Sequence, residues 1–181
     1  MLQPMLEFAI IGFLFDEDLH GYELRKRVAA LTGHVRPIAD GTLYPAIKRL
    51  ENALLISRDI WAGNIAAPRH MLSLTPGGED HHLAQLRNPK ESFITDENRW
   101  FCMLAFLRHL RTPAEQVAVL QRRLDFLTQP ASFFYDGDRP LRAADFDDPF
   151  RQGLMKVASV TSRAEIQWLR ETLASLQPQV A

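Results

Sequence analysis

The sequence is poor in cysteine, which excludes two ways of stabilising a small protein. Cys102 is the only thiol in 181 residues, so the chain can form no internal disulfide and no zinc site built on paired cysteines. The residues on either side of Cys102 are apolar, which predicts a buried thiol that serves in packing. A reactive redox switch, the alternative for this residue, would need a stabilised thiolate.

The sequence also lacks an excess of positive charge. It has 21 Lys and Arg residues against 22 Asp and Glu residues, for a formal net charge of −1. Any surface that binds nucleic acid must therefore arise from local segregation of charge. With 46% hydrophobic and 24% charged residues, the composition is that of a globular protein, which excludes disorder of the whole chain.

A hydrophobic run long enough to cross a bilayer is missing as well. The run from Phe8 to Phe15 is too short to span one. No basic segment precedes it and no small-residue cleavage pattern follows it, so it does not have the features of a signal peptide. We therefore expect a cytoplasmic protein.

Hydrophobic spacing in the first half predicts three helices followed by two strands. Apolar residues recur at helical intervals from about Leu2 to Phe15, from about His20 to Gly33, and from Asp40 to Glu51. Leu55 to Trp61 and Met71 to Leu74 are short apolar runs on either side of turn residues, as in a β-hairpin. This order of elements is typical of a winged helix-turn-helix domain.

The segment from Asp40 to Glu51 combines two different faces. One is an apolar stripe at helical spacing, and the other carries hydroxyl, aromatic and cationic groups. Pro45 has no N–H, which places it in the first turn and makes Thr42 the candidate N-cap. A helix with a positive amino end and outward hydroxyls suits contact with phosphate. On periodicity alone, a core helix with a merely solvated outer face explains the pattern equally well.

The residues after the predicted hairpin indicate where the first domain ends. Thr75 and Pro76 start a further helix as its N-cap and N1 residues, and this helix ends near Arg87. The sequence Asn88-Pro89-Lys90 then gives the best domain boundary. We therefore expect a winged helix domain at residues 1–88 and a helical domain at residues 89–181.

The second half is predicted to be helical. An unusually apolar helix covers about Trp100 to Leu110, and Thr112 opens the next one. Gln129 to Pro149 is irregular, and a last helix runs from about Phe150 to Leu176 with two apolar stripes, which implies two packing partners. The predicted fold class is mainly α with a small two-stranded β-wing: an N-terminal winged helix-turn-helix plus an all-α C-terminal domain.

The sequence contains no arrangement typical of an enzyme or a metal site. His20-Gly21-Tyr22 suggests a catalytic motif, but a structural role at the start of a helix explains it better. Glu79 to His82 are adjacent on one predicted helix and point in different directions, whereas metal ligands on a helix need i, i+3 or i+4 spacing. A P-loop and a Ser–His–Asp arrangement are missing. We predict no enzyme, no cofactor and no metal.

Two motifs resemble those of the PadR-like transcriptional regulators. Residues 19–24 are Leu-His-Gly-Tyr-Glu-Leu, as in the family's second helix. Residues 41–51 are Gly-Thr-Leu-Tyr-Pro-Ala-Ile-Lys-Arg-Leu-Glu, where the family has Gly-Ser/Thr-Leu-Tyr-Pro-x-Leu-x-Arg-Leu-Glu. Residues 71–78 and 163–169 match more loosely, after the wing and in the helical domain of the longer members. The resemblance implies a homodimer, joined by its helical domain, that binds double-stranded DNA.

The resemblance also implies which side chains contact DNA. The hydroxyls of Thr42 and Tyr44 suit phosphate oxygens. The cations that follow them on the same helix suit phosphates or guanine edges, and the preceding helix crosses the DNA backbone. The expected contacts are Arg25, Lys26, Thr42, Tyr44, Lys48 and Arg49. Arg58 is a further flanking candidate, although a surface salt bridge is the commoner fate of such a residue.

Three departures from the family pattern bear on DNA binding. Met71 and Leu72 replace two tyrosines, which removes hydroxyls that could anchor the wing or a phosphate. Leu54 stands where a glycine usually ends the recognition helix, which predicts an end without a left-handed glycine cap. The wing, Gly63 to Ala67, carries no Lys or Arg, so its contact with a DNA groove should be weak.

Aromatic residues gather in the second half, and a dimer core accounts for most of them. The sharper hypothesis is that some line an effector pocket between the two domains, because family members respond to planar molecules and pockets favour domain interfaces. The candidates are Trp100, Phe101, Phe134 and Trp168. The function favoured is a homodimeric repressor, with release by a small aromatic effector as a hypothesis. The alternative is a helical sensor or protein-interaction module that keeps the winged helix only as a scaffold.

Overall fold

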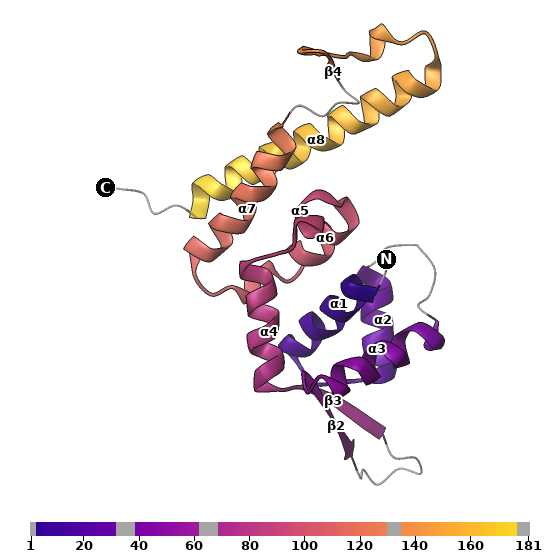
Figure 1. Cartoon of the computed structure of the whole chain (residues 1–181), viewed down its shortest axis with the longest axis vertical. Helices are drawn as coiled ribbons and strands as arrows, with labels where there is room; N and C mark the ends of the chain where they lie inside the picture. Colours follow the sequence, from indigo (N-terminus) through magenta and orange to yellow (C-terminus); the bar gives the residue numbers. More distant parts are fainter. Residues whose placement is uncertain (1–2, 32–38, 62–68, 130–134, 177–181) are drawn as a thin grey trace, which may run out of the picture. The chain divides into compact units, whose positions relative to one another are not determined.

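The chain forms two compact units. The computed structural model describes residues 3–31, 39–61, 69–129 and 135–176. The first unit is Met1–Arg111 and the second is Thr112–Ala181 (Figure 1). The division falls after the boundary predicted at residue 88, because the short helices that follow it pack with the first unit.

The first unit has the helix and strand order of a winged helix-turn-helix. Its elements are α1 Gln3–Asp16, β1 Leu19–His20, α2 Gly21–Leu31, α3 Asp40–Asn52, β2 Ile56–Trp61, β3 Arg69–Leu74, α4 Pro76–Arg87, α5 Glu91–Thr95, α6 Glu97–Leu104 and the 3-10 turn η1 Leu107–His109. Helix α1 is apolar on nearly every side and contacts α2, α3, α4 and α6, so it forms the centre of the core.

The sheet has three strands, one more than the sequence predicted. Its order is β1-β3-β2, and both pairings are antiparallel. Strand β1 pairs Leu19 with Leu72 and His20 with Met71. A strand of two residues has no detectable period of its own, which is why the prediction missed it. The predicted turn and the uncharged wing, Gly63 to Ala67, lie outside the described residues.

Helix α3 begins earlier than predicted. Ala39 is the N-cap, and its carbonyl oxygen accepts hydrogen bonds from the backbone N–H groups of Thr42 (2.8 Å) and Leu43 (3.2 Å). Thr42 is therefore inside the helix, and the prediction that it is the cap was wrong. Pro45 is inside the helix too. Pro45 has no N–H to donate to the carbonyl of Gly41, four residues earlier in the helix. Both residues are exposed, so water can reach that carbonyl instead.

The carboxyl end of α3 is a Schellman motif without glycine. The Leu55 N–H donates to the Leu50 carbonyl (3.0 Å), and the Leu54 N–H donates to the Glu51 carbonyl (2.9 Å). Leu54 has a left-handed φ of 57°. The helix thus ends in the usual backbone geometry, with leucine where that geometry favours glycine.

Helix α4 begins as predicted and holds the end of α3 in place. The Thr75 hydroxyl accepts a hydrogen bond from the Gly78 N–H (3.0 Å) and contacts the carbonyl oxygens of Leu54 (2.7 Å) and Leu55 (3.0 Å). A Cβ at position 78 would collide with the Leu55 carbonyl. Glycine is therefore required here for close backbone approach.

A polar network runs from Asp16 at the surface into the core of the first unit. Asp16 Oδ1 lies 2.9 Å from His109 Nε2, and His109 Nδ1 lies 2.9 Å from His82 Nε2. His82 is fully buried, and burial is the main reason that its pKa falls to about 3, with the neighbouring His109 as a second cause. Through these contacts the network joins Asp16 at the end of α1 to His82 on α4 and His109 in η1.

The predicted helix from Trp100 to Leu110 is interrupted. Helix α6 ends at Leu104, and a 3-10 turn follows at Leu107–His109. Trp100 is completely buried, whereas Phe101 is 47% exposed. Cys102 is buried as predicted, and burial raises the pKa of its thiol to about 12.

The second unit is a pair of long helices, and the segment that connects them contains a small hairpin. Its elements are α7 Pro113–Thr128, β4 Tyr135–Asp136, β5 Arg139–Pro140, the 3-10 turn η3 Ala143–Asp145 and α8 Pro149–Leu176. Apart from this short hairpin, the second half is helical, as predicted. Inside the helix pair, Arg123 is 3% exposed and binds Glu165 through two hydrogen bonds of 2.8 and 2.9 Å.

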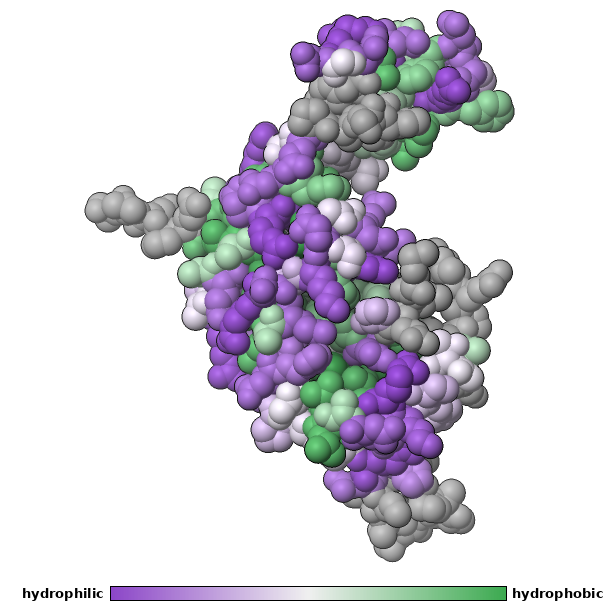
Figure 2. Space-filling view, in the orientation of Figure 1, coloured by the Kyte–Doolittle hydropathy of each residue, from purple (hydrophilic) through white to green (hydrophobic). Residues whose placement is uncertain are grey.

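The two predicted stripes of α8 have different environments. Leu169 and Leu173 are buried on the side of α8 that belongs to the helix pair. The other stripe is exposed in this single chain, and Figure 2 shows hydrophobic surface near the amino-terminal part of α8. Its exposed apolar residues are Phe150, Leu154, Val157, Val160 and Trp168. This side of α8 is therefore without a partner among the described residues.

Candidate nucleic-acid interface

The exposed face of α3 is separated from its buried face as the sequence predicts. Leu43, Ala46, Ile47 and Leu50 are buried, and their neighbours on the other side of the helix are exposed. The exposed residues include Thr42, Tyr44 and Lys48. Tyr44 and Lys48 are four positions apart and so lie on the same side of the helix, whereas Thr42 lies on another flank. A face of this kind can donate hydrogen bonds to phosphate oxygens and to base edges.

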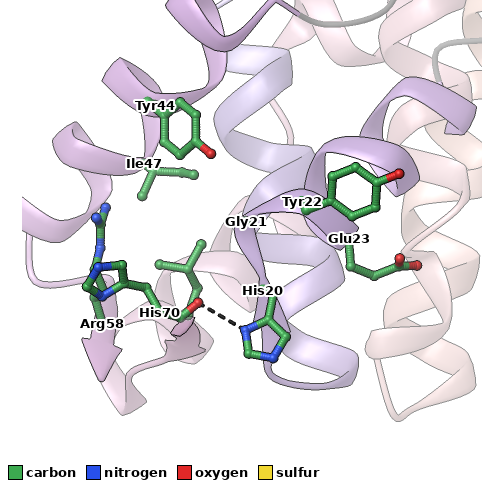
Figure 3. A pocket seen from close by; sticks show the side chains of 9 residues that line it. His20, Gly21, Tyr22, Glu23, Tyr44, Ile47, Arg58 and His70 are labelled. Carbon is green, nitrogen blue, oxygen red and sulfur yellow. Dashed lines mark hydrogen bonds between the residues drawn. The ribbon is translucent and has the colours of Figure 1, made fainter. Parts of the chain in front are cut away.

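The two sequence motifs meet in space along a groove beside α3. A Cβ added to Gly21 would lie 3.7 Å from Tyr44 Cε1, so the first turn of α2 packs against the Tyr44 ring. The groove has a volume of about 520 Å³ and is drawn in Figure 3. Its lining residues are His20, Gly21, Tyr22, Glu23, Tyr44, Ile47, Arg58, His70 and Leu72.

One hydrogen bond fixes the orientation of a histidine in the groove. His20 Nδ1 lies 3.2 Å from the His70 carbonyl oxygen (Figure 3). Because a carbonyl oxygen can only accept, Nδ1 carries a hydrogen. In neutral His20 the other ring nitrogen, Nε2, is then unprotonated.

The cations around α3 differ in their availability for DNA. Lys48 and Lys26 are exposed and make no ion pair with a described residue. The Arg49 Nε donates to Glu7 Oε1 at 2.7 Å, which joins α3 to α1. Arg58 donates two hydrogen bonds, of 2.6 and 3.0 Å, to Glu51. Arg25 lies over the Tyr22 ring, 5.5 Å from its centroid.

The described residues lack the features of a metal site and of a membrane-spanning helix. Within residues 3–31, 39–61, 69–129 and 135–176, no group of three His, Cys, Asp or Glu residues has the geometry to hold a metal ion. No helix in these ranges is long and apolar enough to cross a membrane.

Comparison with known families identifies the first unit. Residues 10–83 match the family described as the transcriptional regulator PadR-like family. These residues belong to the PadR-like family. The match runs from α1 to α4 and includes both motifs, α3 and the whole groove. The match covers less than half of the chain, so it identifies a PadR-like domain within the first unit.

The chain is similar to several solved structures at low identity. Bacillus subtilis PadR in complex with operator DNA is 20% identical, covers 95% of this chain and 99% of its own, and has a TM-score of 0.42. A transcriptional regulator from Clostridium thermocellum is 26% identical over 46% of this chain and 81% of its own, with a TM-score of 0.42. A PadR-like transcription factor from Bacteroides fragilis is 27% identical over 46% and 79%, also with a TM-score of 0.42. No curated protein matches by sequence.

Sequence reasoning about this PadR-like domain missed part of the groove. His20 was interpreted only as the start of a helix, and His70 lies just before the predicted strand Met71 to Leu74. The two residues are 50 positions apart, and only the pairing of β1 with β3 brings them together. The signal that could have found the groove is the pair of motifs, since family motifs on neighbouring helices often share a site.

The predicted effector residues lie in different places. Trp100 is inside the core of the first unit, and Phe101 is on the surface of that unit. Trp168, 39% exposed, lies on α8 of the second unit. Phe134 lies outside the described residues. Within the first unit, the adjacent Trp100 and Phe101 therefore have opposite environments.

Proposed function

We propose that this chain is a PadR-like homodimeric repressor that binds double-stranded operator DNA through α3. The observation that carries the proposal is the exposed surface of α3, which presents the Thr42 and Tyr44 hydroxyls and Lys48. An α-helix with its side chains is about 10–12 Å wide, close to the width of the major groove of B-DNA. Lys26 and Arg25 on α2 would contact the backbone beside it.

Of the six residues predicted to contact DNA, Arg49 has the weakest support. Its guanidinium is held by Glu7 in the free protein. Contact with DNA would require that this ion pair be broken or shared. We therefore assign the principal cationic contact on α3 to Lys48.

The second copy of the chain would cover the exposed stripe of α8. This stripe presents five large apolar side chains on one long helix, among them Phe150, which is 85% exposed. Burial of such residues against a partner removes apolar surface from water. A dimer would also join two weak half-site contacts through effective concentration, and its geometry would fix the spacing of the two α3 helices.

Repression and its release by a small aromatic effector are the finer parts of the proposal. A ligand can act only by binding one dimer geometry better than another, here a geometry that misplaces the two α3 helices. Titration of planar aromatic acids against the intrinsic tryptophan fluorescence tests for such a ligand, since Trp168 is partly exposed. Saturable quenching supports the effector; its absence across a broad panel argues against it.

An electrophoretic shift with DNA from the gene's own upstream region tests the core of the proposal. We expect a shift that Lys48→Ala and Tyr44→Phe both weaken. Lys90→Ala is a matched control, because it removes one exposed charge from the same unit at a site away from α3. No shift by the folded wild type, or a shift unchanged in Lys48→Ala and Tyr44→Phe, would favour a sensor or interaction module that keeps the winged helix as a scaffold.

A further inference from the structure

The groove beside α3 lies where a DNA backbone would run. A duplex that receives α3 in its major groove places phosphates along both flanks of that helix, since helix and groove have nearly the same width. One flank of α3 faces the sheet, and the groove lies there, between Tyr44 on α3 and Arg58 and His70 on the strands. The inference below rests on the proposed DNA binding by α3.

The fixed charges that line this groove cancel. The charged residues in its lining are Glu23 from α2 and Arg58 from β2. Each has an oppositely charged partner: Glu23 lies 3.4 Å from Arg27, and Arg58 binds Glu51. Tyr22 and Tyr44 add neutral phenols. Among the described residues of the lining, positive charge can therefore be gained at ordinary pH only through the imidazoles, His20 on β1 and His70 on β3.

His20 is arranged to take up a proton without moving. Its Nδ1–H donates to the His70 carbonyl in the neutral ring and in the charged ring alike. Protonation therefore occurs at Nε2 and turns that atom from an acceptor into a charged donor. A charged N–H donor binds a phosphate oxygen more strongly than a neutral one.

We propose that His20, assisted by His70, is a proton-linked contact to a DNA phosphate. The negative phosphodiester favours the charged imidazole, so the complex binds a proton that the free protein binds less well. By linkage, DNA affinity then rises as the pH falls through the range in which imidazoles titrate. This assigns to the groove a phosphate ligand and makes repression sensitive to acidity.

Binding of labelled upstream DNA at constant salt, at pH 6.0 and at pH 7.5, tests the proposal. For the wild type we expect affinity about three- to tenfold higher at pH 6.0, since uptake of one proton changes a binding constant by at most tenfold per pH unit. His20→Gln keeps a donor for the His70 carbonyl but cannot be charged, so its affinity should differ by less than about twofold between the two pH values. His81→Gln, on the exposed surface of α4, is the matched control and should keep the wild-type dependence.

The outcomes separate the two ideas. Failure of the folded wild type to bind DNA at either pH overturns the proposed function. DNA binding whose pH dependence is missing in the wild type, or is unchanged in His20→Gln, overturns the proton-linked contact and leaves the repressor intact. If His20→Gln does not fold, calorimetry of wild-type binding at pH 6.5 in two buffers of different ionisation enthalpy decides, because equal heats would mean that no proton is taken up.

Discussion

Leu54 holds a backbone conformation that glycine adopts more easily, and its replacement by glycine should stabilise the first unit. With φ at 57°, Leu54 occupies the left-handed region at the end of α3. That region costs an L-residue with a Cβ about 1–2 kcal/mol. The Leu54 side chain is 77% exposed, so its removal sacrifices only about 0.5 kcal/mol of apolar burial.

The expected net gain from Leu54→Gly is modest. Glycine loses more backbone entropy on folding, about 0.5–1 kcal/mol, which offsets part of the relieved strain. We therefore expect the free energy of unfolding to rise by about 0.5 kcal/mol. Urea unfolding followed by circular dichroism should show a higher midpoint with an unchanged slope.

Two controls isolate the conformational cause. Leu54→Ala removes the side chain but keeps the Cβ, so it should give no gain. Ala53→Gly changes the neighbouring residue, whose φ of −82° suits any residue, and should cost about 0.5–1 kcal/mol. If Leu54→Gly proves no more stable than Leu54→Ala, the left-handed strain argument is refuted.

Four further predictions concern the interior of the two units. Gly78→Ala should destabilise the protein by more than about 2 kcal/mol in urea unfolding, because the new methyl meets a carbonyl oxygen in a packed junction; stability within about 0.5 kcal/mol of the wild type would contradict this. Glu165→Gln removes the charged partner that binds the buried Arg123 through two hydrogen bonds and should cost about 3–5 kcal/mol, whereas the exposed Glu171→Gln should cost little. The His82 pKa of about 3 lies below its ordinary 6.5, so the unfolded chain binds a proton that the folded protein refuses: unfolding free energy should fall as the pH drops from about 6.5 toward 3, by up to about 1.4 kcal/mol per pH unit, and His82→Gln should reduce that slope. The raised pKa of buried Cys102 predicts slow reaction with a thiol reagent in the native protein and fast reaction in urea.

Local signals in the sequence predicted several elements well. Thr75 with Pro76 and Thr112 with Pro113 mark the starts of α4 and α7, because a hydroxyl cap and an N1 proline act within one turn of helix. The split between the two faces of α3 also follows from its period alone. These features depend only on residues close to one another in the chain.

Other features depend on contacts between distant residues, and the sequence could not predict them. Arg49 is bound by Glu7 of another helix, 42 positions away, and the spacing along α3 does not show this ion pair. Pro45 was predicted to lie in the first turn, although it lies further inside α3. The helix tolerates it there because the Gly41 carbonyl is accessible to water, and residue spacing gives no information about that accessibility. The groove beside α3 needed the pairing of β1 with β3, and β1 is too short to show a period.

The dependence of DNA affinity on salt tests the central claim, contact between α3 and DNA phosphates, most directly. For each phosphate neutralised, the slope of log K against log salt concentration changes by about 0.9. We predict a steep negative slope for the wild type and for Lys90→Ala, and a slope shallower by about 0.9 for Lys48→Ala. Wild-type affinity that does not respond to salt, or a slope that Lys48→Ala leaves unchanged, would contradict the account.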